Sequence, residues 1–148
     1  MQEYMLSVKR LINAPVQKVF AAWTDAQSAK QWLSPESHAV ADAVIDPQVG
    51  GIYKIAMRDK DGNFPTTTGT IKELVPNKKL VFTWQWADGN EESNADGETL
   101  VTLDFKAVGE NQTELILTHE KFKSEQSKQG HTQGWESVYN RLEKFLSR

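Results

Sequence analysis

The chain has 148 residues, with 17 Lys and Arg against 20 Asp and Glu, no Cys and five Trp. Without Cys there is no disulfide framework, no thiolate metal site and no Cys nucleophile. A net charge of −3 argues against a protein that mainly binds nucleic-acid phosphates. No stretch approaches the roughly 18 apolar residues of a membrane span, and the first residues lack the pattern of a signal peptide. We therefore expect one cytoplasmic domain over residues 1–148 that neither binds nucleic acid nor inserts into a membrane.

The N-terminal part of the sequence predicts a strand and two short helices. Apolar and polar residues alternate over Tyr4–Ile12, which predicts a strand. A helix should follow, with Asn13 or Ala14 at its start and Pro15 in its first turn, where the missing N–H is not needed. Its apolar residues keep helical spacing: Val16, Val19, Phe20 and Trp23. A second short helix is expected over Ala26–Gln31, ended by Pro35.

From about Ala39 the apolar residues recur with a period of two. The expected strands lie near Ala39–Ile45, Ile52–Arg58, Thr66–Val75, Lys79–Trp86, Glu98–Ala107 and Gln112–Glu120. Their links are short and rich in Gly and Asn, so successive strands should pair as an antiparallel meander. The period then returns to that of a helix from about Glu125 to Leu146, with Ser124 as its N-cap. The predicted fold is α+β, a curved seven-stranded antiparallel sheet wrapped around a long C-terminal helix.

The strand Lys79–Trp86 is the most informative part of the sequence for function. Leu80, Phe82, Trp84 and Trp86 share one face of it. Two Trp residues at the strand end suit either ordinary core packing or the wall of a ligand pocket, because the indole ring is apolar and carries one donor. The polar segment Asp88–Thr99 that follows is expected to be a loop, with a lid over the pocket as a further possibility.

Two glycines in the C-terminal helix, Gly130 and Gly134, support the pocket interpretation. Each interior Gly costs about 1 kcal/mol relative to Ala, so close packing of a strand or space for a ligand could explain them. The alternative is a helix that begins only near Gly134.

Facing strands supply the other candidate site residues. The candidate ligand-binding residues are Tyr53, Met57, Trp84, Trp86, Phe105, His119, Trp135 and Tyr139. His119 ends an apolar row, which suits a buried residue with satisfied hydrogen bonds, a polar anchor for a ligand, or a weak candidate for a catalytic acid or base. Glu120 falls on the opposite strand face. The three His residues lack metal spacing and no cofactor motif occurs, so we expect neither a metal nor a cofactor.

Several short sequence segments, taken in chain order, resemble the START-like, Bet v-type (SRPBCC) superfamily. The resemblance is strongest to the branch similar to the C-terminal domain of the activator of the ninety-kilodalton heat shock protein ATPase. The segments lie at Ile12–Asp25, Lys30–Leu33, Asp46–Gly51, Asp61–Asn63, Leu74–Trp84, Leu117–Glu120 and Gly134–Leu142. The resemblance implies a helix-grip fold with a hydrophobic cavity between sheet and helix. The chain departs from the family at Gln48, where Arg is usual, and at Trp32–Leu33, where the family has two Trp.

Three functions are therefore open. The first, which we favour, is binding of a small hydrophobic or aromatic molecule, or a lipid, in the internal cavity. The second is an interaction module that modulates a chaperone ATPase, which only the resemblance implies. The third is an enzyme of the cyclase or dehydratase type that uses the same cavity, with His119, Tyr139 and Glu120 as candidate groups.

Overall fold

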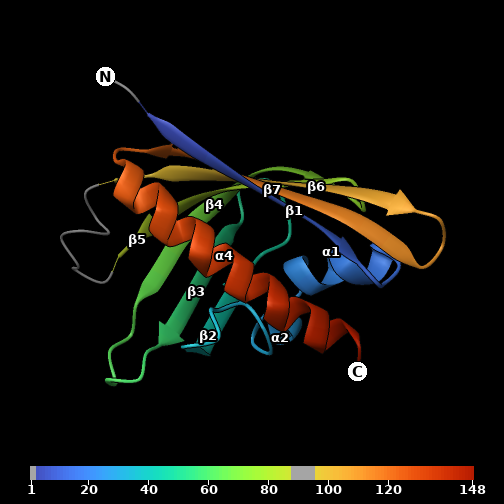
Figure 1. Ribbon diagram of the computed structural model, residues 1–148, viewed down its shortest axis with the longest axis horizontal. Helices are drawn as coiled ribbons and strands as arrows, with labels where there is room; N and C mark the ends of the chain where they lie inside the picture. Colours follow the sequence, from blue (N-terminus) through green and yellow to red (C-terminus); the bar gives the residue numbers. More distant parts are fainter. Residues whose placement is uncertain (1–2, 88–95) are drawn as a thin grey trace.

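The computed structural model describes residues 3–87 and 96–148 and shows a seven-stranded antiparallel sheet with a long helix lying across it (Figure 1). The strands are β1 (Tyr4–Ile12), β2 (Ala39–Ile45), β3 (Ile52–Arg58), β4 (Thr66–Val75), β5 (Lys79–Trp86), β6 (Thr99–Val108) and β7 (Gln112–Phe122). The helices are α1 (Val16–Thr24), α2 (Ala26–Ala29) and α4 (Glu125–Leu146). The predicted α+β helix-grip architecture is confirmed.

The sheet has the strand order β1-β7-β6-β5-β4-β3-β2. Strands β2 to β7 follow one another as the predicted meander, and β1 closes the order by pairing with β7. Register shifts interrupt the pairing within β1, β2 and β4. Such bulges bend a strand and increase its twist, and this helps the sheet to curve around α4.

Most element boundaries agree with the sequence prediction, and the differences are local. Pro15 is the N-cap of α1, with an extended ψ of 148°, and so precedes the first turn instead of lying in it. Helix α2 ends at Ala29, two residues before the predicted Gln31. Strand β7 continues to Phe122, because its pairing with β1 extends to Tyr4. The predicted N-cap Ser124 accepts a hydrogen bond from the Ser127 N–H at 3.0 Å.

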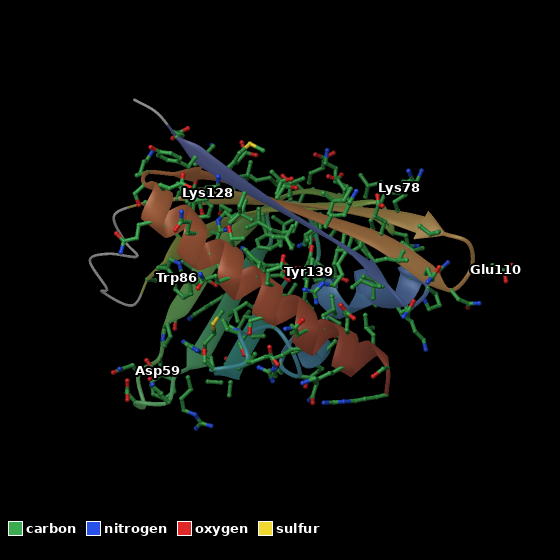
Figure 2. All side chains as sticks on the ribbon, in the orientation of Figure 1. Asp59, Lys78, Trp86, Glu110, Lys128 and Tyr139 are labelled. Atoms are coloured by element: carbon green, nitrogen blue, oxygen red, sulfur yellow. The ribbon has the colours of Figure 1, made fainter. Side chains whose placement is uncertain are left out.

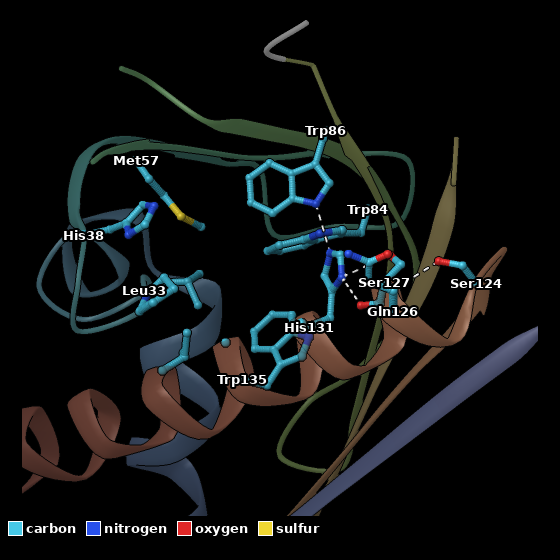
Figure 3. A pocket seen from close by; sticks show the side chains of 14 residues that line it. Leu33, His38, Met57, Trp84, Trp86, Ser124, Gln126, Ser127, His131 and Trp135 are labelled. Carbon is cyan, nitrogen blue, oxygen red and sulfur yellow. Dashed lines mark hydrogen bonds between the residues drawn. The ribbon is translucent and has the colours of Figure 1, made fainter. Parts of the chain in front are cut away.

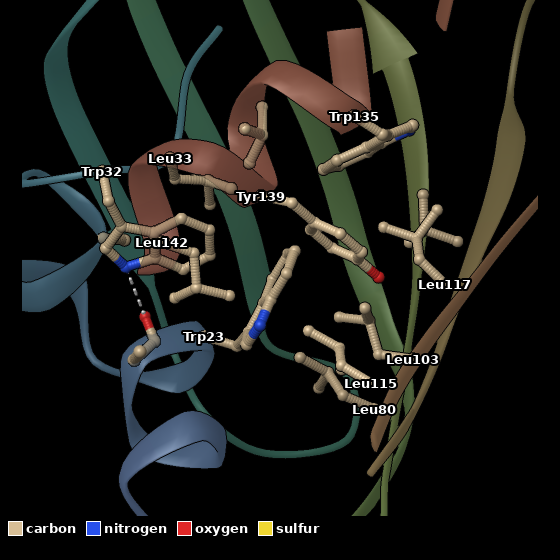
Figure 4. Close-up of a cluster of buried hydrophobic side chains, with 14 of the residues drawn as sticks. Trp23, Trp32, Leu33, Leu80, Leu103, Leu115, Leu117, Trp135, Tyr139 and Leu142 are labelled. Carbon is tan, nitrogen blue, oxygen red and sulfur yellow. Dashed lines mark hydrogen bonds between the residues drawn. The ribbon is translucent and has the colours of Figure 1, made fainter. Parts of the chain in front are cut away.

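The core lies between the sheet and the helices, and aromatic side chains fill its centre (Figure 4). Trp23 of α1 is fully buried, and its ring meets the Trp32 ring edge-on with 4.6 Å between the centroids. Trp32 donates its indole N–H to the Ala22 carbonyl at 3.2 Å. These two Trp residues therefore join helix α1 to the segment after α2 within the core.

Helix α4 is fastened to β1 by both polar and apolar contacts. Arg10 of β1 forms ion pairs with Glu136 at 2.7 Å and with Glu143 at 2.9 Å. Tyr139 donates its hydroxyl to the Val8 carbonyl at 3.1 Å. Figure 2 shows Tyr139 among packed side chains in the middle of the molecule. The C-terminal half of α4 is thus closed onto the sheet.

No helix in residues 3–87 or 96–148 is long and apolar enough to cross a membrane.

Candidate functional site

A cavity of about 430 Å³ lies along the N-terminal half of α4, and we call it the helix–sheet pocket (Figure 3). Its walls come from α4, from the ends of β3 and β5, and from the segment after α2. The lining residues are Leu33, Pro35, His38, Met57, Trp84, Trp86, Ser124, Gln126, Ser127, Gly130, His131, Gly134, Trp135 and Val138. The α4 members recur every three or four residues, so they form one stripe along the helix.

Gly130 and Gly134 both line this pocket; Gly134 is partly buried and Gly130 is exposed. A Cβ atom built at either residue has no heavy atom within 4 Å outside its immediate helical surroundings. The helix is continuous from Glu125, so the alternative that it begins near Gly134 is wrong. Close packing of a strand is absent at both glycines, and space in the pocket is the explanation that fits the partly buried Gly134.

Three Trp rings form the aromatic wall of the pocket. The rings of Trp84 and Trp86 are nearly perpendicular, at 89°, with centroids 5.7 Å apart. The Trp135 ring lies 5.0 Å from that of Trp84 and is tilted by 52°. Met57 of β3 also lines the pocket. The structure therefore brings together four of the eight predicted ligand-binding residues, namely Met57, Trp84, Trp86 and Trp135.

His131, which the sequence analysis did not select, holds Trp86 in place. Trp86 donates its indole N–H to Nε2 of His131 at 3.0 Å. The other ring nitrogen, Nδ1, lies 2.9 Å from the Ser127 carbonyl oxygen. A carbonyl only accepts, and an indole N–H only donates. His131 is therefore neutral, with its proton on Nδ1 and its Nε2 lone pair directed at Trp86.

Asp96 binds the first turn of α4, which carries Ser127, the partner of His131. Its carboxylate accepts hydrogen bonds from the Ser127 hydroxyl and, at 2.7 Å, from the Lys123 backbone N–H. Burial lowers the pKa of His131, and the Ser127 carbonyl and the Asp96 charge oppose this only in part. The neutral form of His131 that the hydrogen bonds require is therefore also favoured by burial.

His119 lies behind the pocket wall and is fully buried. Its Nδ1 accepts the Trp135 indole N–H at 3.0 Å, so its proton is on Nε2, 2.7 Å from the Thr99 hydroxyl oxygen. Thr99 donates its own proton to the Trp84 carbonyl at 2.7 Å. Burial, with a smaller contribution from His131, lowers the pKa of His119 well below its usual value. Both ring nitrogens are thus occupied by partners within the protein, as in the buried-residue interpretation.

The other three predicted ligand-binding residues also lie in the core, outside the pocket lining. Tyr53 donates its hydroxyl to the Trp23 carbonyl at 2.6 Å. Phe105 packs edge-on against Phe20 of α1, with 5.1 Å between the ring centroids. Tyr139 is held by Val8, as described above. Burial raises the pKa of both tyrosines, which keeps them protonated.

The enzyme candidates do not converge. His119 and Tyr139 are buried with their polar atoms bound, and Glu120 lies on the opposite face of β7 from His119. In the described part of the chain no group of three His, Asp or Glu side chains is arranged to hold a metal ion. The predicted lid falls largely on residues 88–95, which lie outside the described residues.

The two departures from the family phrases have visible consequences. Gln48 donates its side-chain amide to the Asp46 carboxylate at 2.9 Å, which is a neutral contact where the usual Arg would bring a charge. Leu33 lines the pocket where the family has a second Trp. The smaller side chain leaves more room in this wall.

Comparisons with known proteins agree with this architecture. A family model described as activator of Hsp90 ATPase homolog 1-like protein matches residues 13–147. No curated protein matches at a significant level.

Solved structures with 21–24% identity show the same fold. A protein from Chromobacterium violaceum is 21% identical, with a TM-score of 0.85, 97% of this chain covered and 97% of that chain. The AHSA1 protein from Silicibacter pomeroyi is 22% identical, with a TM-score of 0.84 and coverage of 97% and 98%. A putative uncharacterized protein from Rhizobium leguminosarum is 24% identical, with a TM-score of 0.83 and coverage of 99% and 96%. Together with the family match over residues 13–147, the seven-stranded sheet and the long helix show that the chain belongs to the activator of Hsp90 ATPase homolog 1-like family.

Proposed function

We propose that the protein binds a small apolar or aromatic molecule in the helix–sheet pocket. The observation that carries this proposal is the open space facing Gly130 and Gly134, opposite the Trp wall. Its volume of about 430 Å³ lies within the roughly 300–1,000 Å³ of typical ligand sites. Apolar and aromatic side chains supply most of the lining, so burial of apolar ligand surface would drive binding.

The helix propensity of the same two glycines in α4 adds to this argument. Each of the two glycines costs about 1 kcal/mol in helix stability relative to Ala. Neither is required by a close neighbour, and neither has a left-handed backbone conformation. A pocket that must admit a ligand gives a reason for this cost.

The proposal can be tested with a substitution in α4 that places a larger side chain in the pocket. The neutral dye N-phenyl-1-naphthylamine, whose fluorescence increases in apolar surroundings, is titrated into the wild-type protein. The same titration is made with Gly134→Leu, which places a side chain in the open space. Gln133→Leu is the matched control, since it adds the same side chain one position earlier, on the exposed face of the same helix.

We expect wild type and Gln133→Leu to bind the dye equally, and Gly134→Leu to bind at least tenfold more weakly. The Leu variant should unfold at the same temperature as wild type or higher, because Leu is a better helix former than Gly. Equal dye binding by all three proteins, or no binding by wild type, would contradict the proposal.

The family match favours one second candidate, the modulation of a chaperone ATPase. It is tested by the ATPase rate of an Hsp90 chaperone with and without excess protein. A rate change that persists in Gly134→Leu would support a surface interaction independent of the pocket. An unchanged rate would remove this candidate.

A further inference from the structure

We infer that the ligand of the helix–sheet pocket is an uncharged aromatic compound. This inference rests on the proposed function and specifies the chemical class that the pocket accepts. It follows from the charges absent from the described lining, from the hydrogen bonds that its polar groups already make, and from the arrangement of its rings.

The described lining contains no Asp, Glu, Lys or Arg. Its two titratable side chains are His38 and His131. His131 has both nitrogens bound, to Trp86 and to the Ser127 carbonyl. His38 lies at the pocket edge, where its Nδ1 pairs with the Ser37 hydroxyl at 2.8 Å. The described part of the lining therefore offers no fixed charge to pair with an ionised ligand.

An ionised ligand would also lose hydration on entry. A charge that leaves water without an ion partner is strongly disfavoured. Protonation of His131 would supply a cation, but it would place an N–H on Nε2 against the Trp86 indole N–H. A bound anion would therefore have to break the contact that holds one wall of the pocket.

One group of cations near the pocket belongs to a different depression. Arg141, Lys144 and Arg148 line a polar hollow of about 280 Å³ that shares only His38 with the helix–sheet pocket. The Arg141 guanidinium donates to the Ser34 hydroxyl and to the carbonyls of His38 and Gln31. It is thus engaged by the segment that separates the two cavities and does not line the apolar one.

The rings of the wall favour a flat aromatic ligand. Trp84 and Trp86 meet at 89°, and Trp135 is tilted by 52° to Trp84, so the pocket presents aromatic surfaces in several orientations. Aromatic groups prefer offset-stacked or edge-to-face contacts, and both are available in such an arrangement. Figure 3 shows these rings across the pocket from Leu33 and Met57, which are apolar.

The test compares ligands that differ in charge and share one ring system. Methyl 2-naphthoate, 2-naphthoate and 2-naphthylmethylammonium are titrated into the full chain at pH 7.5 by calorimetry. We expect the ester to bind at least tenfold more tightly than either ion. Gly130→Lys adds a cationic side chain at a lining position where a Cβ atom meets no neighbour. In this variant the naphthoate affinity should rise at least tenfold, and the naphthylmethylammonium affinity should not rise.

Circular dichroism first checks that Gly130→Lys is folded. Wild-type binding of either ion as tightly as the ester would overturn the inference but leave the proposed function standing. An unchanged naphthoate affinity in Gly130→Lys would overturn it as well, because selectivity would then not depend on the lining charge. If N-phenyl-1-naphthylamine binds but either naphthyl ion binds as tightly as the ester, the inference fails alone. If the dye also fails to bind, the proposed function fails.

Discussion

Trp86, the last residue of β5, donates its indole N–H to Nε2 of His131 on the second turn of α4, with 3.0 Å between the nitrogens. The two residues are 45 positions apart in the sequence. This contact joins the end of a strand to the helix that covers it, at the edge of the helix–sheet pocket. It sets the position of one aromatic wall and requires a neutral histidine.

The contact predicts energetic coupling between the two side chains. His131→Leu removes the acceptor, and Trp86→Phe removes the donor but keeps an aromatic ring. A half-buried pair of this kind should show a coupling energy of about 0.5–1.5 kcal/mol in a double-mutant cycle measured by urea unfolding. Strictly additive effects of the two substitutions would show that the bond contributes nothing to stability.

The buried histidines predict that stability falls on mild acidification. The pKa of His119 is well below 6.5 in the folded protein, and that of His131 is also lowered, whereas both return to about 6.5 on unfolding. The unfolded chain therefore binds more protons below pH 6.5, and the free energy of unfolding should fall there by up to about 1.4 kcal/mol per pH unit for each histidine.

The acidic side chains change the stability of the protein at a lower pH than the histidines do. Hydrogen bonds and charges lower the pKa values of Glu3, Glu36 and Asp59, so their stabilisation is lost only as the pH falls below about 4.5. Urea unfolding at pH 7.5, 6.5 and 5.5 therefore isolates the histidines. A constant free energy of unfolding over this range, or a His119 proton resonance that titrates above pH 6.5, would contradict the assignment.

The chain from Trp135 through His119 to Thr99 makes a second stability prediction. Thr99→Val removes the acceptor for His119 Nε2–H and the donor for the Trp84 carbonyl. Both groups then remain buried without this hydrogen-bond partner. The loss should be about 1–3 kcal/mol. Thr99→Ser keeps the hydroxyl and should recover most of it. If Ser and Val destabilise equally in thermal unfolding, the hydroxyl is not the cause.

Glycine substitutions should have opposite signs at two positions. Gly130→Ala should stabilise the protein by about 1 kcal/mol, because the new methyl group meets nothing and the helix is strengthened. Gly69→Ala should destabilise it by about 1–3 kcal/mol, because a Cβ at Gly69 collides with the backbone carbonyl of Thr83. Chemical denaturation of the two variants compares them directly, and effects of the same sign would contradict the assigned surroundings.

The sequence predicted the elements well because their signals are local. The strand signal of β5 and the Ser124 cap both depend on residues close together in the chain, and the structure confirms the strand and the cap. Alternation shows which residues of a strand face inward. It does not show how far along the strand the pocket lies. Phe105 and Trp84 both face inward, but Phe105 lies under α1 at the closed end and Trp84 lines the pocket.

His131 shows the same limit for polar residues. His131 has no metal-ligand spacing, and no other sequence motif marks it. Its position four residues after Ser127 and four before Trp135 does place all three on the pocket stripe of α4. The partner Trp86 comes from a distant strand, so the hydrogen bond itself depends on the tertiary fold.

The most direct test of the account is to locate a bound ligand by nuclear magnetic resonance. The protein is saturated with methyl 2-naphthoate, and intermolecular nuclear Overhauser effects are recorded from the ligand ring protons. We expect contacts to the methyl groups of Met57 and Val138 and to the Trp86 indole, and their loss in Gly134→Leu. Ligand contacts confined to exposed apolar residues such as Val49 and Phe64, or contacts unchanged in Gly134→Leu, would contradict it.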